Sequence, residues 1–344
     1  MPYSTSVSFC AMLRAFLSTL VLVIGGPAFA ETLSVEGFYG AQADIPAEIE
    51  VLVAEPFAGD WGYGLQESVT GFLIQPIIAD APFFRVIPAA LAARDRIYVI
   101  DSAATSGDGV PFIEVTDRRR ETPDAVLQGA AFSRINDVHA APRTVEECIR
   151  RDGENKCIEH EEVEIPCREM TVAYDAHVAI IQADGTRVYD DSAVLTSAQT
   201  YCRDGDSSPD PDAMIGALAA RYAESVRRDL LPEFKRSDPR LLERRKGLSK
   251  QDRRVFKQAL RLTKNDPFGA CLLFRQLEDG NPRHVSVLFN IGLCEEAEDR
   301  LDQAAAYYER ALIADPGRNY PQTGLRRIEN RKRGEWQLAA KGLI

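Results

Sequence analysis

The sequence lacks the short motifs that mark the common enzyme classes. It contains no Gly-x-Ser-x-Gly elbow, no His-Glu-x-x-His pair and no Cys-x-x-Cys motif, and it has only four histidines. Gly107 and Gly109 lack the lysine that a phosphate-binding loop requires. Asp190 and Asp191 are neighbours in a predicted strand, so their carboxylates point to opposite faces and cannot form an acid–base pair. We therefore expect neither catalysis nor a bound cofactor.

Two groups of residues resemble metal ligands but lack the usual spacing. Cys148, Cys157, His160 and Cys167 offer three thiols and an imidazole, which suit zinc, yet no short cysteine knuckle is present. The acidic run from Asp204 to Asp212 lacks the ordered Asp-x-Asp-x-Asp-Gly loop that binds calcium. Disulfides and helix capping are the favoured interpretations of these residues, so no metal site is expected.

A single apolar run near the start predicts export. Arg14 precedes the run Ala15 to Ile24, and Ala28-Phe29-Ala30 supplies a small-x-small cleavage site. The run is too short for a permanent membrane span and no cysteine follows it, so a transmembrane anchor and a lipoprotein are both disfavoured. We predict a secretory signal at residues 1–30 that is cleaved before Glu31, and a periplasmic protein without stable membrane insertion.

The chain is acidic on average but has one basic stretch. A formal charge of −11 argues against nucleic-acid binding. Between Lys235 and Lys264, however, twelve Lys or Arg residues stand against three acidic ones. The favoured interpretation is a solvated helix face, or a basic face docked on the acidic first part of the chain. The alternative is an anionic partner.

Six cysteines remain after the predicted cleavage, and an even number in an exported chain implies disulfides. Residues 172–180 alternate between apolar and polar, and a second strand pattern follows the turn dipeptide Asp184-Gly185. With that dipeptide as a two-residue loop, paired residue numbers sum to 369, as do 167 and 202. This predicts a Cys167–Cys202 disulfide across the open end of the hairpin, with a bulge somewhere along its strands.

The same argument predicts a second disulfide. Cys148 and Cys157 flank Asp152-Gly153, and a two-residue turn there gives pairs that sum to 305, as do 148 and 157. The two cysteines would then face each other at a non-hydrogen-bonded site. The remaining pair, Cys271 and Cys294, lies in a region expected to be helical and would link neighbouring helices.

The first two-thirds of the chain otherwise mixes strand and helix patterns. Strands are predicted at residues 49–57, 83–89 and 125–137, and helices at 59–75 and after the capping pair Asp210-Pro211. The apolar stripe of the second helix consists of Ile215, Leu218, Tyr222, Val226 and Leu230. Residues 89–123 are predicted to form an exposed loop. This order predicts an α+β fold, a mixed and largely antiparallel sheet with helices packed on it.

These patterns resemble the CsgG-like and TolB-amino-terminal family of envelope proteins over about residues 47–232. The resemblance rests on a strand ending in Pro56-Phe57, the helix after GDWGYGL, the FFRVI strand, and the DAVLQGAAF strand before a hairpin with a DG turn. It implies a noncatalytic assembly or regulatory part. Channel-forming members are lipoproteins with membrane-spanning hairpins, whereas segment 144–168 is too charged to face lipid. A channel is therefore not expected.

The last third resembles a tetratricopeptide repeat (TPR) over about residues 249–318. The signature positions are held by Leu288, Gly292, Ala304, Tyr308, Ala311 and Pro316. One repeat earlier, Ala270, Phe274 and Pro282 match again. The small Gly292 and Ala304 would let two antiparallel helices approach closely, with Tyr308 filling the groove between them. The resemblance implies an all-α domain of helical hairpins with a groove for a protein or peptide, followed by a polar capping helix.

These interpretations divide the chain into a signal (1–30), a sheet domain (31–232), a basic linker (233–248) and a helical domain (249–344). The leading hypothesis is a noncatalytic periplasmic adaptor that binds envelope proteins or peptides through the repeat groove around Asn290 and Arg310. Oligomer formation is left open. The alternatives are a thiol-dependent enzyme or redox component, and a module that binds a glycan or a lipid headgroup.

Overall fold

The computed structural model describes residues 31–89, 123–205 and 207–344. The predicted signal and most of the predicted loop at 89–123 lie outside the described residues. Within the described part, no helix combines the length and the apolar character needed to cross a bilayer.

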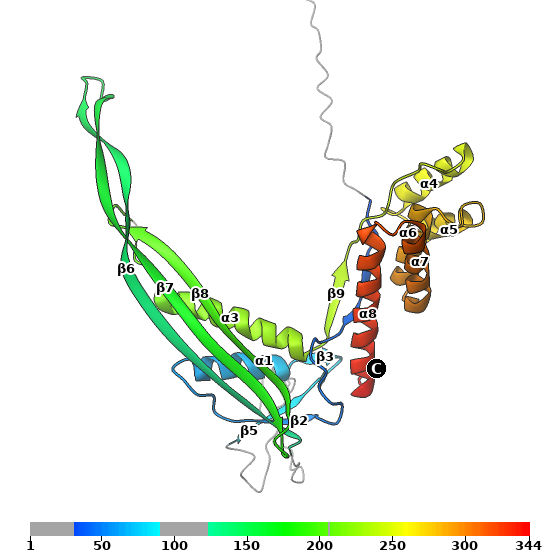
Figure 1. The fold of residues 1–344 in the computed structure, drawn as a ribbon, viewed down its shortest axis with the longest axis horizontal. Helices are drawn as coiled ribbons and strands as arrows, with labels where there is room; N and C mark the ends of the chain where they lie inside the picture. Colours follow the sequence, from blue (N-terminus) through cyan, green and yellow to red (C-terminus); the bar gives the residue numbers. More distant parts are fainter. Residues whose placement is uncertain (1–30, 90–122, 206) are drawn as a thin grey trace, which may run out of the picture.

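A five-stranded sheet in the order β5-β2-β6-β7-β8 forms the first part of the molecule (Figure 1). Its strands are β2 (Val51–Ala54), β5 (Arg85–Pro88), β6 (Ala125–Arg151), β7 (Cys157–Gln182) and β8 (Arg187–Cys202). Strand β2 is parallel to β5 and β6, whereas β6, β7 and β8 are antiparallel. Helices α1 (Gly62–Leu73) and α3 (Pro211–Leu230) pack against the sheet. The predicted mixed sheet with packed helices is confirmed.

The core of this part follows from the apolar stripes of the two helices. All five predicted stripe residues of α3 are buried, together with Leu65 and Val69 of α1. They pack on the alternate side chains of β7, among them Val172, Tyr174 and Val178. Asp210 caps α3 by accepting a hydrogen bond from the N–H of Asp212 (3.0 Å), as the sequence indicates.

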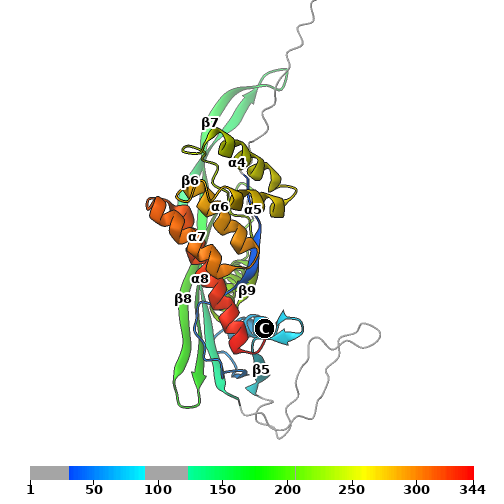
Figure 2. The ribbon, with the colours of Figure 1, turned by 90° about the vertical axis from the view of Figure 1, so that its right-hand side faces the viewer.

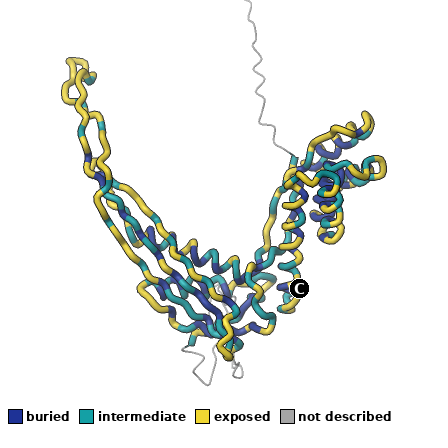
Figure 3. Tube along the Cα trace, in the orientation of Figure 1, coloured by how far each residue is buried: buried dark blue, intermediate teal, exposed yellow. Residues whose placement is uncertain are grey.

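Strands β6 and β7 continue past the end of β8 and project as a two-stranded arm, residues 141–166 (Figure 1). Figure 3 shows that most of the arm is exposed. The two hairpins predicted around Asp152-Gly153 and Asp184-Gly185 share a strand, because the 26-residue β7 belongs to both. The one proline of β6, Pro142, falls within a register shift between Ala140 and Arg143, so it does not end the strand.

The turn at the end of β7 and β8 differs from the prediction. Pairs from Cys167 with Cys202 to Ile180 with Tyr189 follow the predicted register, but Ile181 pairs with Arg187. The loop has three residues, not two, because the Gln182 N–H donates to the Thr186 carbonyl (2.9 Å) and Gly185 takes a φ of 86°. The left-handed Gly185 ends a type I turn here. The expected bulge, at the Ile180/Ile181 register shift, restores the register.

The turn at the tip of the arm differs in the same way. The Asp152 N–H donates to the Lys156 carbonyl (2.9 Å), and Asn155 adopts the left-handed conformation with a φ of 65°. The predicted two-residue turn is therefore wrong. Cys148 pairs with His160, and Cys157 pairs with Arg151, so the two cysteines lie diagonally instead of directly opposite each other.

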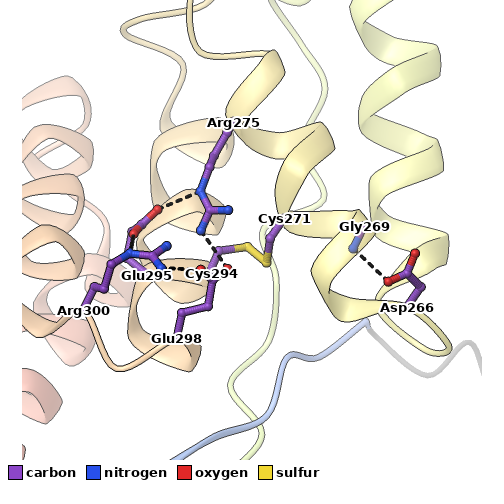
Figure 4. The surroundings of a disulfide bond; sticks show 8 residues. All are labelled: Asp266, Gly269, Cys271, Arg275, Cys294, Glu295, Glu298 and Arg300. Carbon is purple, nitrogen blue, oxygen red and sulfur yellow. Dashed lines mark hydrogen bonds and ion pairs between the residues drawn. A yellow bond between two sulfur atoms is a disulfide. The ribbon is translucent and has the colours of Figure 1, made fainter.

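Three disulfides nevertheless join the same cysteines that the sequence pairs. Their Cα–Cα distances are 5.8 Å for Cys148–Cys157, 4.1 Å for Cys167–Cys202 and 5.6 Å for Cys271–Cys294. The third links two helices beside an ion-pair cluster in which Arg275 contacts Glu295 and Glu298 (Figure 4). Disulfides of this number fit an exported protein.

The second part of the molecule is helical. It comprises α4 (Lys250–Leu262), α5 (Pro267–Gln276), α6 (Val285–Ala297), α7 (Leu301–Ala314) and α8 (Asn319–Ala340). At its centre the ring of Tyr308 lies between two glycines, because a Cβ on Gly292 of α6 or on Gly324 of α8 would stand 2.7 Å from that ring. Tyr308 therefore holds three helices at close distance.

Helix α8 connects the two parts. Its Ile328 belongs to the core of the helical part, whereas Leu338 belongs to the core of the sheet part. Gln337 accepts a hydrogen bond from the N–H of Ala41 (2.8 Å). A polar capping helix was expected, and the structure instead shows a buried face of small and polar residues that includes Arg331 and Gly334.

Residues 233–248, expected to be a linker, are also ordered. Strand β9 (Glu233–Ser237) pairs antiparallel with β1 (Val35–Tyr39), which runs beside α8. A further short pair consists of β3 (Pro76–Ile78) and β4 (Ala81–Pro82). After β9, Leu241 and Leu248 are buried in the core of the helical part.

Candidate anion-binding pocket

The groove expected around Asn290 is occupied by the chain itself. The side chain of Asn290 is fully buried, and its amide makes two hydrogen bonds to the main chain of Leu242. The Leu242 N–H donates to Oδ1 (2.9 Å), and Nδ2 donates to the Leu242 carbonyl (3.1 Å). Segment 241–248, which contains a turn at Lys246-Gly247, therefore lies against α6, in the place where the hypothesis put a partner.

Segment 241–248 forms one wall of a cavity of about 460 Å³. We call this cavity the basic pocket. Its walls are the segment 242–247, the start of α6 and the turn between α7 and α8, and its charged lining residues are Glu243, Arg244, Lys246, Arg283, Asp315 and Arg318. Four cations thus face two carboxylates.

The cations of the basic pocket are not neutralised equally. Arg318 donates to Asp315 (2.8 Å), three residues earlier in the chain. Arg244, Lys246 and Arg283 are exposed, and among the described residues none of the three has an ion-pair partner. The pocket therefore carries an excess of positive charge that is available to a ligand.

The beginning of α6 adds to this charge. His284 is the N-cap residue, and its side chain makes no capping hydrogen bond, so the first-turn N–H groups of this 13-residue helix are not capped by a side chain. These groups and the helix dipole favour a negative charge. The His284 ring lies in the pocket wall, where its Nε2 contacts the Lys246 carbonyl (3.2 Å) and its Nδ1 is buried without a hydrogen-bond partner among the described residues.

His284 makes stability depend on pH. Burial lowers its pKa from 6.5, with a smaller contribution from Arg244 in the same direction, so the ring loses its proton at a lower pH in the folded protein than in the unfolded chain. The unfolded chain therefore binds a proton more readily than the folded protein does. The contribution of His284 to the free energy of unfolding is fully present above the ordinary pKa of about 6.5, and it is lost as the pH falls below that value.

Replacing His284 by glutamine should remove this pH-dependent component. We expect the difference in free energy of unfolding between pH 7.5 and pH 5.5, taken about one unit on either side of the ordinary histidine pKa, to be smaller in the variant. Urea unfolding of both proteins at the two pH values measures it. An unchanged difference would show that His284 titrates as it does in water.

Two other cavities of the described residues have most of their cations in ion pairs. One of about 640 Å³ is lined by Asp299, Arg300, Asp302 and Lys332, among others. Asp299 contacts Arg331, Asp302 contacts Lys332, and Arg300 contacts Glu295 and Glu298. A second cavity of the same volume contains the pair Arg333–Asp44 and one cation without an ion-pair partner among the described residues, Arg326. Neither cavity gathers three such cations, as the basic pocket does.

The structure brings together few of the residues considered for chemistry. Cys148, Cys157 and Cys167 are oxidised, and across residues 31–89, 123–205 and 207–344 no group of three metal-ligating side chains converges. On β7, His177 contacts Asp190 (2.7 Å) on one side of the sheet. The main-chain carbonyl of the next residue, Asp191, accepts a hydrogen bond from Tyr222 of α3 (2.9 Å).

The predicted repeat residues lie in one region. Leu288 and Gly292 are buried in α6, and Ala304, Tyr308 and Ala311 are buried in α7. Pro316 follows α7 and is exposed. Arg310, the second position of the expected groove, forms an ion pair with Glu278.

Sequence reasoning missed most of the basic pocket. Arg244 and Lys246 belong to the basic stretch that the sequence shows, but Arg283, His284 and Arg318 come from two distant segments. No local pattern joins these segments, because only the packing of segment 241–248 against α6 brings them together. The unusual histidine before the apolar run of α6 is the one local signal.

Comparisons with known proteins do not name a family. No family model matches the chain, and no curated protein matches it. A solved structure from Helicobacter pylori, described as a neuraminyllactose-binding hemagglutinin homolog, is similar over 54% of this chain and 82% of that chain. The identity is 10% and the TM-score is 0.21, so the similarity assigns neither a family nor a function.

Proposed function

We propose that this chain is a noncatalytic binding protein of the bacterial periplasm that holds an acidic segment of a partner protein in the basic pocket. The observation that carries the proposal is the presence of three unpaired cations, Arg244, Lys246 and Arg283, around a cavity at an uncapped helix start. Such a site binds carboxylates through charge-assisted hydrogen bonds.

The architecture supports an adaptor. The tetratricopeptide and CsgG-like resemblances of the sequence both imply protein binding. Because Asn290 holds segment 241–248, we place the partner in the basic pocket beside that segment instead of in the groove that the repeat pattern implies. The projecting arm gives the molecule a second exposed surface, on the opposite side from the helices α4 to α7 in Figure 1.

An acidic protein segment suits the pocket better than a membrane surface does. The three cations line a cavity whose wall also carries Glu243 and Asp315, instead of forming an all-basic cluster of the kind that binds anionic lipid. The two carboxylates would repel a densely anionic membrane and would restrict an acidic peptide to one register. A glycan or lipid-headgroup module remains the alternative, since the same cations serve it. The thiol-dependent alternative is less supported, because all six cysteines of the described part form disulfides.

The test is a titration of the protein with a fluorescent oligoglutamate peptide. Reversing Arg244, Lys246 and Arg283 to glutamate should weaken binding at least about tenfold, a change of about 1.4 kcal/mol. The control reverses Arg254, Lys257 and Arg261, which lie on the exposed face of α4. Both triple variants change the net charge equally, so a difference between their peptide affinities would come from a local site. Added salt should weaken the wild-type complex.

Three outcomes would contradict the proposal. Equal losses in the two triple variants would mean that binding reflects the overall charge. Binding to phosphatidylglycerol vesicles but not to the peptide would favour the headgroup alternative. No binding of either probe by the wild-type protein would remove the pocket as an anion site.

A further inference from the structure

Strand β8 is a long and unprotected edge of the five-stranded sheet. It pairs with β7 on one side, and none of the described elements pairs with its other side. Figure 2 shows β8 at the outer margin of the sheet. The opposite edge, β5, has four residues and ends at Pro88, whereas β8 has 16 residues.

The pairing with β7 determines which backbone groups of β8 face outward. Cys167 and Cys202 are directly opposite with a Cα–Cα distance of 4.1 Å, which identifies a non-hydrogen-bonded pair. Every second residue from there is of the same kind and points its N–H and C=O away from β7. Between Asp190 and Cys202, which are of this kind too, these residues are Ser192, Val194, Thr196, Ala198 and Thr200, and all five side chains are exposed.

The edge lacks the devices that keep strand edges apart. Residues 192–201, SAVLTSAQTY, contain no charged residue, no proline and no glycine, and the register shift of β8 lies outside them. Val194 is 65% exposed. Such an edge is a template for a further strand, and a strand without charges is the partner that it fits.

We propose that β8 pairs antiparallel with β8 of a second copy of this chain, centred on Thr196, and so joins two five-stranded sheets into one. The outward-facing residues then form hydrogen-bonded pairs, with Thr196 on the two-fold axis and Val194 against Ala198 of the other copy. This arrangement is isologous and closed.

Charges at the ends of the edge favour a second copy in this orientation. In the proposed register Arg203 of one copy lies opposite Tyr189 and diagonal to Asp191 of the other, at both ends of the interface. Parallel pairing in register would instead place Asp190 and Asp191 of one copy beside Asp190 and Asp191 of the other, where like charges repel. The chain supplies a neutral strand with complementary ends, which an arbitrary partner does not.

The test measures the oligomeric state of the mature protein by sedimentation equilibrium. Wild type should dimerise, and Thr196→Lys should weaken dimerisation at least about tenfold, because two ammonium groups would meet on the axis. The control is Asn136→Lys, which adds the same charge on the same face but two strands away from the edge. Circular dichroism checks that both variants fold.

A second measurement locates the contact. Under mild oxidation Thr196→Cys should give a covalent dimer and Asn136→Cys should not, because only residue 196 meets its own copy. A monomeric wild-type protein, a dimer unaffected by Thr196→Lys, or equal cross-linking of the two cysteine variants would overturn the proposal. This inference does not depend on the basic pocket, which lies in the helical part.

Discussion

Replacing Arg327 by methionine is expected to lower the free energy of unfolding by about 3–5 kcal/mol. The Arg327 side chain is 12% exposed, and it contacts both carboxylate oxygens of the fully buried Glu296. Tyr308 donates to the same carboxylate (2.6 Å). Without the Arg327 guanidinium, the buried Glu296 carboxylate would keep its hydrogen bond from Tyr308 but would lose its cationic partner in this cluster.

The pKa shifts of this cluster show how strongly its members depend on one another. Burial alone would lower the pKa of Arg327, but hydrogen bonds and the charge of Glu296 raise it. Burial and the negative charge of Glu296 hold the pKa of Tyr308 well above 10.0. Removing the Glu296 carboxylate would therefore lower the pKa of both Arg327 and Tyr308.

Urea unfolding followed by circular dichroism measures the effect of Arg327→Met. The matched control is Arg310→Met, which breaks an ion pair with Glu278 whose arginine is 41% exposed. A pair of that kind contributes about 0–1 kcal/mol. Equal losses in the two variants would contradict the view that burial makes the Glu296 pair important.

The second large effect is expected at Gly59, in the GDWGYGL segment before α1. Gly59 has a φ of 96°, a conformation that costs a residue with a side chain about 1–2 kcal/mol. A Cβ there would also overlap the carbonyl oxygen of Ala131 in β6. That carbonyl accepts a hydrogen bond from the Trp61 N–H (3.1 Å), so it cannot move freely.

Gly59→Ala should therefore destabilise the sheet part by the backbone cost together with about 1–3 kcal/mol for the overlap. The control is Gly71→Ala in the last turn of α1, where a Cβ would meet nothing within 4 Å. Alanine there should stabilise by about 0.5–1 kcal/mol, because glycine is a poor helix former. Thermal unfolding distinguishes the two variants by sign. Similar changes would show that Gly59 has no special role.

Several features of the fold could be predicted because they depend on local patterns. The stripe of α3 and the cap at Asp210 follow from residue spacing and side-chain chemistry. The disulfide pairs follow from cysteine positions near turn dipeptides. The turn types could not be predicted. Asp184-Gly185 suits both a two-residue loop and a three-residue loop that ends in a left-handed glycine, and at the tip of the arm the left-handed residue is Asn155, two positions after the Asp152-Gly153 dipeptide.

The role of α8 could not be predicted from its composition. Its buried face contains Gly324, Arg331, Gly334 and Gln337, which a search for apolar periodicity passes over. Their burial depends on the segments of the chain that pack against this face of α8. A Cβ on Gly334 would stand 2.7 Å from the carbonyl oxygen of Phe38, a residue nearly three hundred positions earlier. The basic pocket is a similar case, because its walls come from three segments that only the folded chain brings together.

The central claim is that an acidic segment binds in the basic pocket, and site-specific photo-crosslinking tests it most directly. A photoreactive phenylalanine analogue is placed at the uncharged pocket residue Val285 in one protein and at the exposed Gln258 of α4 in the other, and each is irradiated with the oligoglutamate peptide. We predict an adduct from position 285 that excess unlabelled peptide suppresses, and little adduct from position 258. Equal yields from both positions, or an adduct from position 258 alone, would contradict the claim.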